Sequence, residues 1–261
     1  MKTAPPYPAA AMAPLDPQLV LGAYAVGVFP MADARDADSV YWVEPKYRAI
    51  LPLDGFHVSH SLRKTIVSNR FRVTADTAFE TMIALCAESA ADRPDTWINP
   101  QIEGAFIELH RMGFAHSIEI WEEDRLVGGL YGLALGRSFF GESMVSRARD
   151  ASKVAIAWLV ARLRLGGFTL LDCQFMTAHL ASLGAIEIPR ATYVGLLSSA
   201  LEGVVGAGAG AGASVPGSAS VGDFFALERG VVLPAGSIVP ASIDSGPPTG
   251  KVIAQLLVQT S

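Results

Sequence analysis

The residues best suited to chemistry are Asp172 and Gln174, which lie two positions apart in the segment 168–174. The apolar residues of this segment predict a strand, so the two side chains share one face of it. A carboxylate and an amide together could orient an incoming amine and relay its proton. The alternative is an Asp near a strand end that caps the next loop. Cys173 points to the opposite face, where we expect it to pack in the core.

Glu142 is a further candidate because of its surroundings in the sequence. It stands between two apolar runs, where an unpaired carboxylate would be costly. The carboxylate therefore needs a partner, which is either a bound substrate group or, in the simpler interpretation, Arg147.

Basic residues are concentrated in one stretch of the chain. Residues 46–72 contain Lys46, Arg48, Arg63, Lys64, Arg70 and Arg72 against only Asp54. Six positive charges minus one negative charge give +5, on a chain of net charge −5. Such a strip could hold nucleic-acid phosphates. The alternative is an ordinary solvated helix face.

The apolar pattern predicts the elements that position these groups. Helices are expected over 17–26, 59–68, 76–90, 100–112, 151–165, 177–183 and 190–201, with Asp76 and Asp150 as N-caps. Strands are expected over 72–74, 115–121, 126–135, 138–145 and 168–174. Gly128 and Gly129, inside one strand, indicate a bulge or the close approach of a ligand.

The order of these elements predicts the fold class. Three meandering strands are followed by a crossover helix and a further strand, which is typical of a mixed α/β (α+β) sheet. The pattern resembles the core of the N-acetyltransferase (GNAT) fold. We expect a small N-terminal domain over 1–48, a GNAT-like catalytic domain over 49–201 and a Gly/Ala/Ser linker over 202–222. A flexible C-terminal tail follows over 223–261, with short strands such as 252–258 as the alternative.

Composition excludes several classes of protein. Of the 261 residues, 51% are hydrophobic and 17% charged, which provides a sizeable core and excludes a wholly disordered chain. A negative net charge excludes a histone-like nucleic-acid coat. The two cysteines cannot build a disulfide framework or a zinc site, so we expect no metal and a cytoplasmic location.

Neither a membrane span nor a coenzyme A (CoA) site is predicted. No stretch has the ~20 predominantly apolar residues that a span needs, and prolines interrupt the N-terminal segment that could mimic a secretory signal. A pyrophosphate cradle needs a glycine-rich turn at a helix start. The turn over 145–152 has no glycine, and Asp150 would repel a pyrophosphate there. The alternative is that Arg147 and Arg149 bind a phosphate through their side chains.

Short segments spread over residues 19–197, about 70% of the chain, together resemble one family, the leucyl/phenylalanyl-tRNA–protein transferases. The segments are Gly27-Val-Phe-Pro30, Tyr41-Trp42 with Pro45 and Arg48, Phe71-Arg-Val-Thr74, Thr96-Trp-Ile98, His116-Ser-Ile-Glu119, Leu126-Val-Gly-Gly-Leu-Tyr-Gly132, Gly141-Glu-Ser-Met144, Ala151-Ser-Lys153, Leu171-Asp-Cys-Gln174, and Ser182-Leu-Gly-Ala185 with Ile188-Pro-Arg190. Any one alone is weak evidence, whereas their order along the chain is specific.

The resemblance implies an aminoacyltransferase with a GNAT-like larger domain. Such an enzyme moves Leu or Phe, with Met as a further candidate, from aminoacyl-tRNA to the α-amine of proteins that begin with Arg or Lys. The transfer marks those proteins for degradation by the N-degron route. It requires no metal and no cofactor, and we expect the enzyme to be a monomer that does not bind membranes.

The resemblance also implies roles for individual residues. Asp172 and Gln174 match the pair at the family's catalytic centre, and Glu142 is expected to bind the aminoacyl amine, a ribose hydroxyl or the basic N-terminus of the protein substrate. Tyr24 and Trp97 are candidates to stack on the terminal adenosine. The expected pocket lining is Leu130, Phe139, Ile156 and Leu159, and the expected tRNA contacts are Arg63, Lys64, Arg70 and Arg72.

Two rival functions stay open on the sequence alone. A CoA-dependent N-acyltransferase on the same fold is disfavoured by the glycine-free turn. A non-catalytic tRNA-binding protein would keep the basic strip but would have no use for Asp172 and Gln174.

Overall fold

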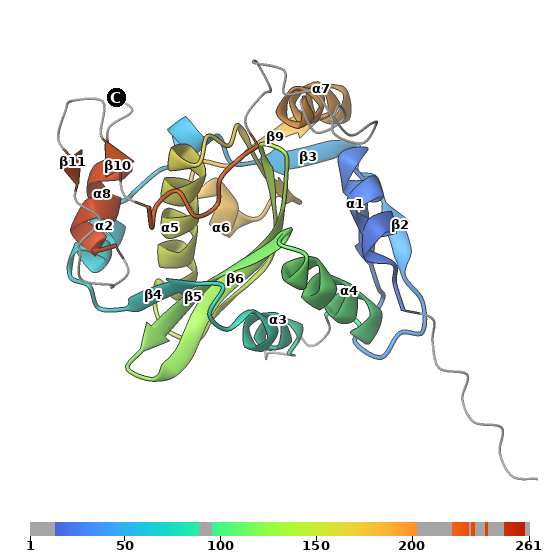
Figure 1. Cartoon of the computed structure of the whole chain (residues 1–261), viewed down its shortest axis with the longest axis horizontal. Coiled ribbons are helices and arrows are strands. Elements are labelled where there is room, and N and C mark those ends of the chain that lie inside the picture. The colour runs from blue at the N-terminus through green and yellow to red at the C-terminus, as the bar shows by residue number, and fades with distance from the viewer. Residues whose placement is uncertain are drawn as a thin grey trace, which may run out of the picture.

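The computed structural model describes residues 14–88, 96–202, 221–229, 231–232, 238–239 and 248–258 (Figure 1). Its helices are α1 (Pro17–Ala25), α2 (His60–Val67), α3 (Phe79–Ala87), α4 (Pro100–Arg111), α5 (Ala151–Leu165), α6 (Ala178–Ala181), α7 (Arg190–Leu201), α8 (Gly250–Leu256) and a short 3-10 helix (Leu53–Gly55). Its strands are β1 (Phe29–Met31), β2 (Tyr41–Val43), β3 (Tyr47–Ile50), β4 (Arg72–Ala75), β5 (Ala115–Glu122), β6 (Arg125–Leu135), β7 (Ser138–Ser146), β8 (Leu170–Gln174), β9 (Ile186–Pro189), β10 (Val231–Val232) and β11 (Ile238–Val239).

A seven-stranded mixed sheet forms the centre of the molecule, in the order β4-β5-β6-β7-β8-β3-β9. Neighbouring strands are antiparallel except β7 and β8, which are parallel because α5 crosses over between them. The predicted mixed α/β fold, with its meander, crossover helix and further strand, is confirmed.

Each face of this sheet is covered by helices, and the strand pleat divides the core between them. Phe139 and Leu171 face the α5 side, where α2 and α8 also pack. Their neighbours Phe140 and Leu170 face the side covered by α1, α3, α4 and α7. Figure 1 shows α5 and α3 on opposite sides of the sheet. The small hairpin β1–β2 lies beside α1.

Side-chain caps explain several of the helix starts. The Asp16 side chain accepts a hydrogen bond from Gln18 N at the start of α1, and Asn99 accepts one from Ile102 N at the start of α4. The cap expected at Asp76 is wrong, whereas Asp150 does hold the N-cap position predicted for it. Asp76 precedes α3, which begins at Phe79, and its carboxylate instead accepts a hydrogen bond from Ser117 N. Asp150 has the N-cap position of α5, but its φ of 69° is left-handed and its side chain makes no capping bond.

The two glycines within β6 meet neighbouring protein atoms rather than a ligand. A Cβ on Gly129 would lie 2.2 Å from Ile118 O and 2.5 Å from Met82 Sδ, and the φ of Gly129 is +149°. The pairing of β5 and β6 shifts register at Ile120 and Trp121, close to Gly128. The bulge is therefore confirmed, and α3 and β5 occupy the space near Gly129 where a ligand was an alternative.

The C-terminal tail has described parts that pack on the catalytic domain. Phe224 stacks on His116, with ring centroids 4.1 Å apart, and Glu228 forms an ion pair with the buried Arg162 of α5. The strand suggested over 252–258 is wrong, since α8 is a helix there. Residues 203–220 of the predicted linker lie outside the described residues.

Three further predictions concern the domain boundary, membrane spans and metal sites. The domain boundary expected at residue 48 falls inside β3, which pairs with β8 and β9, and the domain limits stay a prediction. Among the residues that the structure describes, none of the helices has the length and apolar character of a membrane span. Within the same ranges, no three His, Cys, Asp or Glu side chains converge to form a metal site.

Candidate active site

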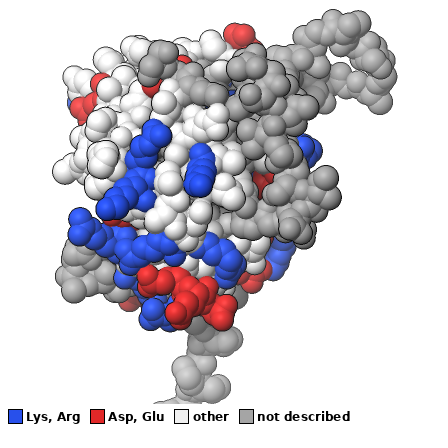
Figure 2. Space-filling view, turned by 90° about the vertical axis from the view of Figure 1, so that its left-hand side faces the viewer, with Lys and Arg blue, Asp and Glu red and all other residues white. Residues whose placement is uncertain are grey.

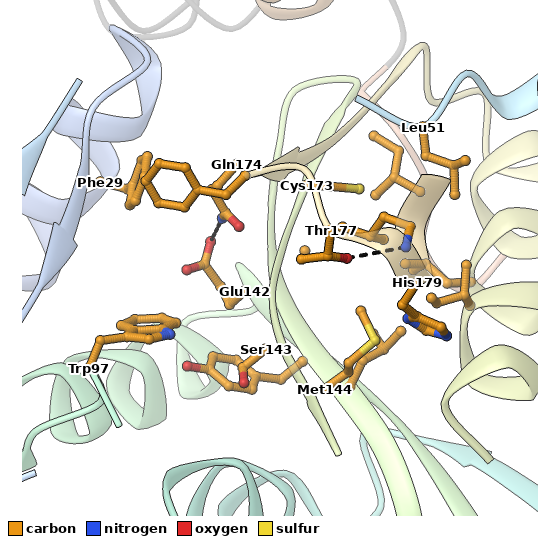
Figure 3. A pocket seen from close by; sticks show the side chains of 18 of the residues that line it. Phe29, Leu51, Trp97, Glu142, Ser143, Met144, Cys173, Gln174, Thr177 and His179 are labelled. Carbon is orange, nitrogen blue, oxygen red and sulfur yellow. Dashed lines mark hydrogen bonds between the residues drawn. The ribbon is translucent and has the colours of Figure 1, made fainter. Parts of the chain in front are cut away.

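The candidate site opens where two parallel strands stop pairing. The register of β7 and β8 ends at Phe140 opposite Asp172. Two residues further along each strand, Glu142 and Gln174 both line a pocket of about 440 Å³. Figure 3 shows these two side chains pointing toward one another in the middle of the pocket. The divergence of the strands thus creates the cavity and gives it a polar centre.

Glu142 and Gln174 are joined by a hydrogen bond in which Gln174 Nε2 donates to Glu142 Oε1 at 2.8 Å. Both residues are buried, at 8% and 7% exposure. Glu142 Oε2 has no hydrogen-bond partner among the described residues. Burial raises the pKa of Glu142 to about 8, although the nearby Tyr24 hydroxyl opposes this rise. The alternative partner Arg147 is wrong, because Arg147 pairs with Glu88.

Asp172 does not line the pocket, and it is completely buried next to it. Its carboxylate receives Arg48 Nε at 2.9 and 3.0 Å, Arg48 Nη2 at 2.6 Å, the Tyr193 hydroxyl at 2.9 Å and Gln174 N at 2.8 Å. Burial and the charge of Asp172 raise the pKa of Tyr193, which therefore stays a hydrogen-bond donor. With both oxygens engaged and no exposed surface, Asp172 is suited to hold other groups in position.

One of the groups that Asp172 holds is the backbone of Gln174. Gln174 has a φ of +55°, a left-handed conformation that non-glycine residues seldom adopt. The hydrogen bond from Gln174 N to Asp172 Oδ1 stabilises this conformation at the end of β8. The two residues predicted to act together therefore divide their roles, since only Gln174 reaches the pocket.

Arg48 is the partner that sequence reasoning missed. The sequence places it in the basic strip proposed to hold phosphates, whereas the structure buries it to 1% exposure. Its guanidinium carbon lies 4.6 Å from the ring centroid of Phe29 and 4.5 Å from that of Tyr193, and Nη1 donates to Gly27 O at 3.0 Å. Arg48 thus joins β8 to α7 and to the segment between α1 and β1.

The apolar end of the pocket is formed largely as predicted. Leu130 of β6 and Ile156 and Leu159 of α5 line it. Phe139 does not, because it points into the core on the α5 side and stacks on Phe224, with ring centroids 5.8 Å apart. Lining residues that were not predicted include Leu51, Met144 and Leu180.

The two aromatic candidates have different surroundings. Trp97 lines the pocket and lies across from Met144 and His179 in Figure 3. Tyr24 has no exposed surface, and its ring makes edge contacts with Phe106 and Phe140. Tyr24 therefore offers no face to an adenosine in this structure.

Comparison of the sequence with known proteins shows which family the chain matches. The model of the leucyl/phenylalanyl-tRNA protein transferases matches residues 50–198, and the model of their N-terminal domain matches residues 13–46. A leucyl/phenylalanyl-tRNA–protein transferase of Rhizorhabdus wittichii is 62% identical over 253 residues, which cover 96% of this chain and 100% of that protein. The chain belongs to this family. A protein of the same name from Zymomonas mobilis is 64% identical over 72% of this chain and 70% of its own length. Another from Novosphingobium aromaticivorans is 49% identical over 95% of this chain and 97% of its own length.

Membership makes this protein an aminoacyltransferase, and two further pocket residues of the transferase bear on its chemistry. Cys173 lines the pocket, and burial raises the pKa of its thiol well above the ordinary value. The thiol therefore stays protonated, in line with the packing role predicted for it. His179 lines the far end, where burial lowers its pKa and keeps the ring neutral.

The predicted tRNA contacts of the transferase lie at the surface. Arg63 and Lys64 are exposed on α2, and Arg72 lies over the Trp121 ring at 4.8 Å. Arg70 is paired with Glu122 at 3.1 Å, which offsets its charge. Figure 2 shows Lys and Arg side chains gathered on the face that carries α2 and α8, with acidic side chains below them.

Proposed function

We propose that the protein transfers Leu or Phe from aminoacyl-tRNA to the α-amine of a protein substrate. The observation that supports this most is the Glu142–Gln174 pair in the lining of a pocket that also has apolar walls from Leu130, Ile156 and Leu159. Family membership supports the same reaction. The pair provides polar contacts for a reacting ester, and the apolar end provides room for an uncharged side chain.

The lining of the pocket favours one orientation of a bound aminoacyl adenosine. Leu130, Ile156 and Leu159 suit the Leu or Phe side chain, because they contribute apolar surface without fixed polar partners. Trp97, across the pocket, offers an aromatic face to the terminal adenine. This orientation brings the ester between the two ends, beside Glu142 and Gln174.

The reaction is the aminolysis of an activated ester. The amine nitrogen attacks the carbonyl carbon, a C–N bond forms, the bond to the ribose oxygen breaks, and one proton passes from the amine to that oxygen. An α-amine has an ordinary pKa near ~8, and Glu142 has a pKa of about 8. Proton exchange between two groups of matched pKa is nearly neutral in free energy, so Glu142 is suited to carry this proton.

Gln174 and Asp172 act at different distances from the ester. Gln174 donates to Glu142 through Nε2, which leaves its amide oxygen as an acceptor for the incoming amine. Asp172 is a positioning residue that maintains the left-handed backbone of Gln174 and the place of Arg48. The sequence predicts that Asp172 relays the proton, and we propose this role for Glu142 instead.

The finer features of the function rest on the family resemblance. We propose that the protein substrates begin with Arg or Lys, that transfer marks them for the N-degron route, and that Met is a further amino acid accepted. The flexible thioether of Met144 suits a lining that accepts more than one side chain. Neither Cys86 nor Cys173 forms a disulfide with a described residue, which suits a cytoplasmic enzyme, and a monomer suffices because this chain alone forms the pocket.

The rival CoA-dependent reaction receives no support from the start of α5. Asp150 holds the N-cap position at the start of α5, and Arg147 in the same turn is already paired with Glu88. Carboxylate charge at a helix start repels a second anion. No contact in this turn favours acyl-CoA as the donor.

Transfer of label from [14C]Leu-tRNA to a peptide with N-terminal Arg, without CoA, tests the proposal. The wild-type enzyme should transfer label, and Gln174→Ala should lower kcat by at least tenfold with little change in tRNA affinity. Gln18→Ala, on the exposed face of α1, is the matched control and should retain full activity. Binding of tRNA without transfer by the wild type would favour a non-catalytic protein, and transfer from acyl-CoA alone would favour the rival enzyme.

A further inference from the structure

Helix α8 lies beyond the part of the chain that the family models match, yet it packs closely on the catalytic domain. The models end at residue 198, and α8 spans Gly250–Leu256. Gly250 N donates to Asn69 Oδ1 at 2.7 Å, and a Cβ on Gly250 would lie 1.8 Å from Ile66 O. Arg164 Nη1 donates to Leu256 O at 3.0 Å. Both ends of α8 are therefore held in place.

A groove of about 400 Å³ runs between α2 and α8. Its apolar floor comes from both helices, and its rim carries Arg63 of α2 and Lys251 of α8. The lining residues are Arg63, Val67, Lys251, Ala254, Gln255 and Val258. Two cations from segments far apart in the sequence thus face one groove, although only Arg63 belongs to the basic strip found in the sequence.

The charge on this surface is unbalanced. Neither α2 nor α8 contains an acidic residue, whereas together they contain Arg63, Lys64 and Lys251, all exposed. Among the described residues, none of these three cations forms an ion pair, in contrast to Arg70 on β4. Cations without acidic partners leave an unbalanced positive potential, which attracts an anionic ligand.

We propose that α8 extends the tRNA-binding surface, and that Lys251 and Arg63 together hold the phosphate backbone of the acceptor stem in the groove between α2 and α8. This inference rests on the proposed function, because it assigns a contact for the same aminoacyl-tRNA. The RNA backbone is favoured over an acidic peptide because the basic side chains spread across the face in Figure 2, as a continuous row of phosphates requires.

The salt dependence of tRNA binding tests this proposal. Lys251→Gln should weaken binding several-fold at ~0.1 M salt and lower the slope of log K against log salt by about one, as loss of one phosphate contact predicts. Arg229→Gln is the control, because it removes a positive charge from the same tail at a residue that is paired with Asp223. It should leave both the affinity and the slope unchanged.

A short substrate separates this proposal from the proposed function. Leu esterified to adenosine alone has no acceptor stem, so Lys251→Gln should leave its transfer unchanged while raising KM for Leu-tRNA. Gly250→Ala, which displaces α8 from α2, should reproduce the loss of tRNA affinity. If wild-type enzyme transfers Leu but Lys251→Gln keeps full tRNA affinity and the same slope, the α8 contact is refuted. If the variant instead loses binding only to anionic lipid vesicles or to polyglutamate, the groove serves another partner and the proposal is likewise refuted.

Discussion

Replacing Asp172 with Asn tests whether the buried ion pair supports the site. The substitution removes the negative charge but keeps the size of the side chain, so its main effect is to leave Arg48 unpaired. Arg48 is 1% exposed and has one further hydrogen bond, to Gly27 O. The charge therefore cannot be solvated without moving β3 or β8.

The expected cost follows from this burial. Removing one partner of a buried ion pair destabilises a protein by about 3–5 kcal/mol, because an uncompensated charge remains. For a chain of this size each kcal/mol lowers Tm by roughly 2–4 °C, so Asp172→Asn should lower Tm by roughly 6–20 °C. The weaker hold on Gln174 N should also lower kcat more than it raises KM.

Urea and thermal unfolding of matched variants give the measurement. Glu122→Gln is the control, because it breaks the ion pair with Arg70, whose side chain is 44% exposed, and should cost at most about 1 kcal/mol. Replacing both Arg48 and Asp172 with Met and Leu should restore part of the stability but none of the activity. The reasoning is refuted if Asp172→Asn costs no more stability than Glu122→Gln.

Two further predictions concern buried groups. Because the pKa of Glu142 is about 8 when folded and near 4.5 when unfolded, the native state binds the extra proton between these values, so wild-type stability should fall as pH rises through that window. The expected fall is on the order of a few kcal/mol, and Glu142→Gln should remove it. If urea unfolding shows that wild type and Glu142→Gln lose the same stability between pH 5 and pH 8.5, the prediction is contradicted. Gly129→Ala should destabilise by at least ~2 kcal/mol, because its Cβ would meet Ile118 O at 2.2 Å. Gly104→Ala in α4, with open space around the added Cβ, should be neutral or stabilising in the same thermal melts, and equal losses would argue against a steric cause.

The long elements could be predicted from the sequence because local signals determine them. The Asn99-Pro100 start of α4 and the apolar periods of β5 and β6 needed no tertiary information. Asp76 resembles an N-cap equally well, but contacts distant in sequence, with Ser117 N and with His116 Nδ1 at 2.7 Å, take its carboxylate. A local pattern cannot indicate which of two partners a side chain will have.

The sequence indicated some of the residues that line the pocket, but not the contacts that hold them in place. The spacing of Asp172 and Gln174 and the apolar surroundings of Glu142 indicated Gln174 and Glu142, and both lie in the pocket. Arg48 was misassigned because β3 has only four residues and carries no clear period, so nothing local indicated that it lies between β8 and β9. Tyr24 and Phe139 were misassigned because the sequence does not determine which side of a helix or strand faces a cavity.

The two buried carboxylates, Asp172 and Glu142, are suited to different roles, one in positioning and one in proton exchange. A carboxylate that receives Arg48, Tyr193 and a backbone N–H has both oxygens engaged by the protein, so it can hold neighbouring groups in place but offers no free atom to a substrate. Glu142 has the opposite character, since burial raises its pKa and its Oε2 has no hydrogen-bond partner among the described residues. An activated ester needs positioning more than a strong base. A fixed carboxylate that orients Gln174, beside a second one that can exchange a proton, meets both needs without placing two free charges in one pocket.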